Sequence, residues 1–108
     1  MIADRNRSLH NLIMDKITTT IKRPWLAEII AGTKKIEYRE IKPYWDKRLE
    51  NVSVPFELRL INGMQSSAPE VTVIIEKIRK NKRDEVYELH IGKIIGFKNW
   101  NKKKARPR

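Results

Sequence analysis

The feature that most constrains this fold is a short segment that places fixed charges where a strand normally carries apolar side chains. Gly32, Lys34, Glu37 and Arg39 follow the spacing G-x-K-x-x-E-x-R. Residues 35–41 alternate as a strand does, so Glu37 and Arg39 should share one face. An isolated buried charge is costly, and these side chains therefore need either each other or a ligand.

Two short helices and about five strands are predicted around this segment. A helix over residues 24–31 should begin at Pro24 and end at Gly32 in the left-handed conformation. A second helix over residues 43–49 should cover one end of a barrel. Alternating or continuous apolar residues predict strands at 17–22, 35–41, 54–60, 71–78 and 85–91, with Gly92 and Gly96 marking the exit from the last. This pattern favours an α+β fold with a partly closed β-barrel, because closure removes exposed strand edges.

The 108 residues are expected to form one domain over residues 18–100. Residues 1–17 are predicted to be a helical or partly ordered extension, and residues 101–108 a disordered basic tail. No apolar run approaches the roughly 20 residues of a membrane-spanning helix, so no membrane partner is expected. The absence of cysteine fits a reducing compartment, and we predict a cytoplasmic protein without a metal or cofactor.

The chain is strongly basic, with a net charge of +11, and six of its cations fall in residues 98–108. A second group of cations surrounds a predicted turn and includes Lys80, Lys82 and Arg83. Such residues follow a phosphate backbone in some proteins and are merely solvated in others, and both interpretations stay open.

The charged segment and its surroundings resemble the ASCH domain family, which is related to PUA-like RNA-binding barrels. The resemblance covers roughly residues 18–100. It is carried by the G-x-K-x-x-E-x-R residues, by Lys42-Pro43-Tyr44-Trp45, by Leu60-Ile61-Asn62-Gly63 and by His90-Ile91-Gly92-Lys93. It implies a small PUA-like barrel whose signature residues line a ligand cleft.

Two interpretations of Lys34, Glu37 and Arg39 follow. They are either an ion-pair clamp between strands, or a ligand site in which the cations donate to a phosphate or base and Glu37 accepts from an amino group. The aromatic residues Trp25, Tyr44, Trp45 and Trp100 are candidates for stacking on a base. Trp25 is expected to pack in the core, and one of Tyr44 and Trp45 is expected to line a surface.

The leading functional prediction is binding of RNA, single-stranded or looped, or of a nucleotide-like small molecule. The predicted ligand residues are Lys34, Glu37, Arg39, Tyr44, Trp45, Lys80, Lys82 and Arg83. The basic turn and tail should add affinity that depends on salt.

The first alternative is an enzyme. Some relatives in this family are amidohydrolases that remove an acyl group from N4 of cytidine with a Lys, a Thr and a Glu. The Lys falls on Lys34, but Glu37 occupies the Thr position, and Glu76, Glu85 and Glu88 all remain candidates for the Glu. Lys34 and Glu37 would then be the catalytic residues of such a hydrolase or of a ribonuclease. A further alternative is a protein-interaction module.

Overall fold

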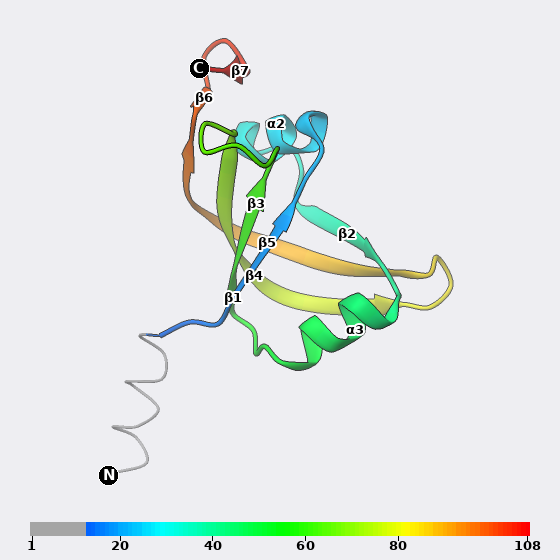
Figure 1. Cartoon of the computed structure of the whole chain (residues 1–108). Helices are drawn as coiled ribbons and strands as arrows, with labels where there is room; N and C mark the ends of the chain where they lie inside the picture. Colours follow the sequence, from blue (N-terminus) through cyan, green and yellow to red (C-terminus); the bar gives the residue numbers. More distant parts are fainter. Residues whose placement is uncertain (1–12) are drawn as a thin grey trace.

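Five strands form a single curled sheet in the computed structural model, which describes residues 13–108 (Figure 1). They are β1 (Lys16–Thr20), β2 (Ile36–Glu40), β3 (Phe56–Ile61), β4 (Glu70–Asn81) and β5 (Val86–Lys98). Their order in the sheet is β1-β3-β4-β5-β2. The β1–β3 pair is parallel, and the other pairs are antiparallel. The two edge strands are therefore β1 and β2.

The curl of the sheet comes from the two long strands. The start of β4 pairs with β3, whereas the start of β5 pairs with β2, so the β4–β5 ribbon links two differently oriented halves. Its register shifts between Thr72 and Val73, between Ile74 and Ile75, and between Ile75 and Lys77. Because each bulge bends its strand and increases the local twist, these shifts roll the sheet into a half-barrel. The fold is thus α+β with a partly closed barrel, as the sequence predicted.

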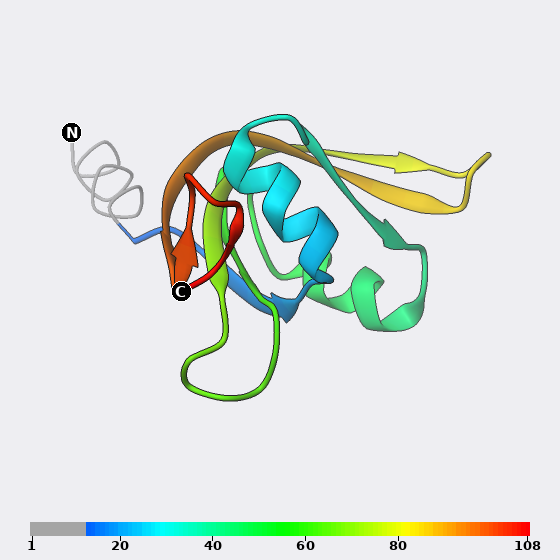
Figure 2. The same cartoon turned by 90° about the horizontal axis from the view of Figure 1, so that it is seen from above.

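Two helices lie against this sheet, namely α2 (Arg23–Ala31) and α3 (Pro43–Glu50). Each carries a proline in its first turn, where the missing N–H costs nothing. Gly32 ends α2 with a φ of 84° and donates its backbone N–H to the carbonyls of Glu28 and Ile29. Seen from above, α2 lies inside the curve of the sheet (Figure 2). Both predicted helices and the glycine cap are confirmed.

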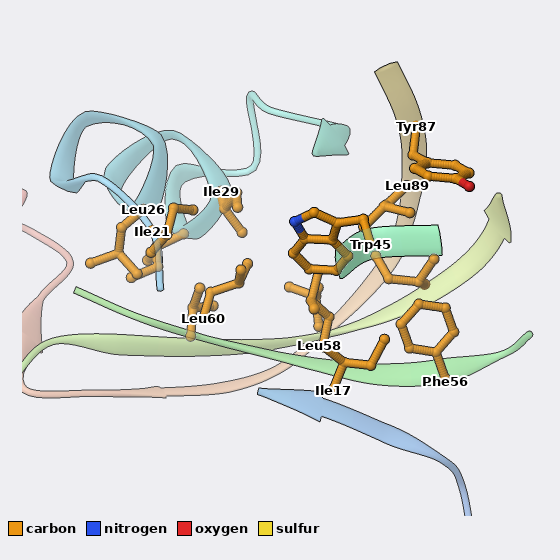
Figure 3. Packing of buried hydrophobic residues seen from close by; sticks show 14 of the residues in the cluster. Ile17, Ile21, Leu26, Ile29, Trp45, Phe56, Leu58, Leu60, Tyr87 and Leu89 are labelled. Atoms are coloured by element: carbon orange, nitrogen blue, oxygen red, sulfur yellow. The ribbon is translucent and has the colours of Figure 1, made fainter. Parts of the chain in front are cut away.

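The hydrophobic core fills the space between the helices and the concave face. Leu26, Ile29 and Ile30 of α2 are buried, together with Leu58 of β3 and Leu89 of β5. The indole of Trp45 enters this cluster from α3, between side chains of β3 and β5 (Figure 3). Trp45 therefore anchors α3 to the barrel.

The last predicted strand is longer than expected. Gly92 and Gly96 lie within β5 instead of ending it. Glu76 has no partner in the ladder, and its side chain occupies the place that a Cβ on Gly92 would take, within 2.0 Å of that position. Gly92 thus makes room for a bulge in the neighbouring strand, and it is not a strand terminator.

The ends of the chain also differ from the prediction. Residues 101–108 were expected to be a disordered tail, but β6 (Trp100–Asn101) pairs with β7 (Arg106–Pro107) in a second small sheet. Of the predicted extension over residues 1–17, the first twelve lie outside the described residues, and the last two belong to β1. Over the part of the chain that the structure describes, neither helix has the length and apolar character needed to cross a membrane.

Candidate functional site

Strand β2 presents charges to the interior and an aromatic residue to the exterior. Glu37 is only 4% exposed and is paired in the ladder with the buried Leu89. Arg39 follows on the same face beside Tyr87, whereas Tyr38 on the other face is 51% exposed. An ordinary half-buried strand points apolar residues inward and charged residues outward, whereas β2 does the opposite at these positions. The prediction that Glu37 and Arg39 share a face is confirmed.

Glu37 holds a cation with each carboxylate oxygen. Lys34 Nζ lies 3.5 Å from Glu37 Oε1, and Arg39 Nη2 donates a short hydrogen bond to Glu37 Oε2. The side chains of Lys34 and Arg39 are only 12% and 16% exposed. We call these three residues the Lys34 cluster. It carries one net positive charge next to the core, and both of its cations depend on one carboxylate.

Arg39 also connects the two edge strands of the half-barrel. The same Nη2 atom donates to the backbone carbonyl of Thr20 at the end of β1, at 2.9 Å. Arg48 of α3 donates to the carbonyl of Thr18, also at 2.9 Å. Both guanidinium groups lie near the Trp45 ring, 5.2 Å away for Arg39 and 5.8 Å for Arg48. Arginine side chains therefore satisfy carbonyls of β1 that face the seam between the edge strands. The ion pairs of the cluster thus lie within residues 34–39, and the link between the edge strands is the hydrogen bond from Arg39 to the Thr20 carbonyl.

One donor of the cluster has no partner. Among the described residues, Arg39 Nε is one of two buried side-chain nitrogens that make no hydrogen bond, the other being His90 Nε2. A buried donor of this kind is unfavourable unless something accepts from it. Arg39 Nε therefore carries an unpaired N–H that is closed off from solvent.

Two exposed aromatic rings flank Lys34. Its Nζ lies 5.3 Å from the ring centroid of Trp25 and 5.1 Å from that of Tyr38. Trp25 is 47% exposed, so the expectation that it packs in the core is wrong. The reason is geometric: on α2, the buried stripe is formed by Leu26, Ile29 and Ile30, and Trp25 falls beside it. The Lys34 ammonium group is thus close to two exposed rings, one on α2 and one on β2.

The other candidate aromatics divide between surface and core. Tyr44 is 59% exposed, whereas Trp45 and Trp100 are 7% and 3% exposed. The structure therefore agrees that one of the adjacent pair Tyr44 and Trp45 lines a surface. Trp45 reaches the Lys34 cluster only through Arg39, from the core side.

The predicted basic turn does not join the Lys34 cluster. Lys80, Lys82 and Arg83 are all exposed at the tip of the β4–β5 hairpin, which projects beyond the rest of the sheet (Figure 2). A cavity of about 780 Å³ lies there; its lining includes Lys42, Lys80 and Lys82, but also three carboxylates, and none of the Lys34 cluster. The lining is therefore electrically balanced, unlike a simple phosphate groove.

A second charged group lies on the outer face of the sheet, and of its members the sequence singled out only Glu88 as a candidate site residue. Glu88 is 8% exposed and accepts hydrogen bonds from Asn81 and Arg79. The hydrogen bond from Asn81, followed by Arg79, holds the pKa of Glu88 below its ordinary value. His90 Nε2 lies 3.7 Å from the same carboxylate. The sequence held a signal for this group, because charged and apolar residues alternate along β5. Tyr87 and Leu89 face the core, so Glu88 and His90 must lie on the opposite face.

The three glutamates considered for a hydrolase have different surroundings. Glu88 is occupied by its partners on the outer face, Glu85 lines the cavity at the hairpin, and Glu76 lies against Gly92 in the bulge. Across residues 13–108, the one ion pair of Lys34 is with Glu37. The same residues contain no group of three potential metal-ligating side chains.

Comparisons of the chain with protein-family models, with curated proteins and with solved structures give no match. Functional inference therefore rests on the geometry of the site and on the motif residues themselves.

Proposed function

We propose that this protein binds single-stranded or looped RNA, or a nucleotide-like ligand, at the surface formed by Trp25, Lys34 and Tyr38. The observation that carries the proposal is that the Lys34 ammonium group lies 5.3 and 5.1 Å from the centroids of two aromatic rings that are each about half exposed. Stacking on aromatic rings combined with cationic contacts is how proteins commonly bind single-stranded nucleic acid.

Each group has a distinct part in this binding. A base stacks on Trp25 or Tyr38, and Lys34 donates to a base carbonyl or to a phosphate. Glu37 acts through Lys34 as a positioning residue, because its carboxylate holds the ammonium group in place.

The resemblance to ASCH domains supports the same assignment, since Lys34, Glu37 and Arg39 are the signature positions expected to line the ligand cleft. The net charge of +11 and the exposed cations of the β4–β5 hairpin would add affinity that falls as salt rises.

The direct test is fluorescence anisotropy with a labelled, unstructured 12-nucleotide RNA of mixed sequence at low salt. Loss of a stacked base costs about 1–3 kcal/mol, so Trp25→Ala and Tyr38→Ala should each weaken binding by roughly 5- to 150-fold. Phe97→Ala is the matched control, because Phe97 is also exposed, at 38%, but lies on β5. No binding by the wild type, or equal binding by the Trp25→Ala, Tyr38→Ala double variant, would refute the proposal.

The enzyme alternative is separated by a second measurement. Both oxygens of Glu37 already contact cations within the Lys34 cluster. Wild type and Lys34→Ala are incubated with N4-acetylcytidine and with labelled RNA. Turnover that disappears in Lys34→Ala would replace the binding-only proposal with a hydrolase.

A further inference from the structure

A second cavity, of about 520 Å³, lies beside the edge strand β1. Thr18 and Thr20 of β1, Arg59 of β3 and Glu70 of β4 contribute from the sheet. Residues 63–66 form one side of the cavity, and Tyr44 of α3 also lines it. The volume falls within the range of small-ligand sites, which is roughly 300–1,000 Å³.

The charges in this cavity cancel each other. Arg59 donates two hydrogen bonds to the carboxylate of Glu70, at 3.1 and 2.8 Å. The hydrogen bond from Arg59 also lowers the pKa of Glu70, so the carboxylate stays ionised and neutralises the guanidinium. The other polar groups of the lining, such as the threonine hydroxyls and the Gln65 amide, are uncharged. An uncharged polar ligand fits this lining better than a phosphate does.

Tyr44 gives the cavity a flat aromatic surface that is held in place. Its ring is 59% exposed, and the Arg48 guanidinium lies 5.0 Å from the ring centroid. Arg48 is itself fixed by its hydrogen bond to the carbonyl of Thr18. An ordered, exposed ring beside uncharged hydrogen-bonding groups is suited to a planar heterocycle.

The cavity adjoins the Lys34 cluster through one residue. Thr20 lines the cavity, and its carbonyl accepts the hydrogen bond from Arg39. The seam between the edge strands therefore has an aromatic surface on each side: Trp25 and Tyr38 beside Lys34, and Tyr44 beside Arg48.

We infer that this cavity is a second base-binding subsite, which takes the uncharged base of another nucleotide in the RNA strand bound at Lys34. The inference rests on the proposed function. The base stacks on Tyr44, and its edge bonds to the threonine hydroxyls and to Gln65. The strand then crosses the seam over Arg39 and Arg48, which are already fixed by carbonyls of β1.

The test uses the full chain and the same labelled 12-nucleotide RNA. Tyr44→Ala removes the stacking surface and should raise the Kd about tenfold, within the roughly 5- to 150-fold expected for one stacked base. Tyr44→Phe keeps the ring and should bind within about twofold of wild type. Thr18→Val removes one hydroxyl but keeps the backbone carbonyl that fixes Arg48, and should weaken binding by a few fold. Circular dichroism and thermal melting verify that each variant is folded.

The outcomes separate the two proposals. If the wild type does not bind, the proposed function fails. If the wild type binds and Trp25→Ala weakens binding while Tyr44→Ala does not, the second subsite is refuted and the proposed function stands. Equal loss in Tyr44→Ala and Tyr44→Phe also overturns the subsite, because stacking would not be its basis.

Discussion

The Glu37→Gln substitution should destabilise the fold by about 3 kcal/mol, because it leaves two poorly solvated cations without their anion. Removing one partner of a buried ion pair typically costs about 3–5 kcal/mol. We take the lower end because Lys34 and Arg39 keep 12% and 16% of their side-chain exposure. Glutamine preserves the volume and one carbonyl oxygen, so the loss reports the charge and not a cavity. With a typical urea m-value of about 1–3 kcal/mol/M, the unfolding midpoint should fall by roughly 1–3 M at pH 7.

Glu40→Gln on the same strand is the matched control. Glu40 pairs with Lys42, but both side chains are about two-thirds exposed. Exposed ion pairs contribute at most about 1 kcal/mol, so this substitution should be nearly silent. The buried Trp45 and Trp100 allow unfolding to be followed by fluorescence. A Glu37→Gln loss no larger than the Glu40→Gln loss would refute the reasoning, because the cluster would then be solvated like any surface pair.

Three further predictions concern the rest of the fold. The pKa of Glu88 is lowered chiefly by its hydrogen bond from Asn81, so the stability it contributes is present above about pH 4.5 and is lost as pH falls through the lowered pKa. Acid titration of the urea midpoint should therefore show a weaker decline in Glu88→Gln. The hydrogen bond to Asp46 raises the pKa of Tyr87 to about 12, so its contribution holds at neutral pH and disappears as pH rises from about 10 to 12. Tyr87→Phe should cost roughly 1.5–3 kcal/mol at pH 7 and abolish this alkaline loss in denaturation experiments. Gly32→Ala has open space for its methyl group but needs a φ of 84°, so calorimetry should show a loss of roughly 1–2 kcal/mol.

Local signals in the sequence predicted the elements of this fold well. Both helices were placed correctly from Pro24, Pro43 and Gly32, because a proline or glycine affects the backbone only a few residues to either side. The same local reasoning failed at Gly92, which resembles a terminator but lies inside β5. Its role is set by Glu76 in the neighbouring strand, a contact that depends on register and bulge position, and no local pattern encodes it.

The candidate site was predictable in part for the same reason. Strand alternation was sufficient to place Glu37 and Arg39 on one face. It could not show that Arg39 would reach a carbonyl of β1, because Thr20 lies far from it in the chain and the contact requires the curl of the sheet. Trp25 was misassigned because a stripe on a two-turn helix is narrow, and one position decides between core and surface.

The Lys34 cluster closes a barrel seam with charges, although apolar residues could fill the same space. Replacing a buried ion network by apolar residues of similar volume is often neutral or stabilising by about 1–4 kcal/mol. A Lys34→Met, Glu37→Leu, Arg39→Met triple variant should therefore stay folded, with a stability at or above that of Glu37→Gln. It should nevertheless lose RNA affinity, since it keeps Trp25 and Tyr38 but has no donor near them. Unchanged RNA affinity in a folded triple variant would mean that the charges only connect the two edge strands and do not contribute to RNA binding. Lost affinity would mean that these charges serve recognition, at a position where stability does not require them.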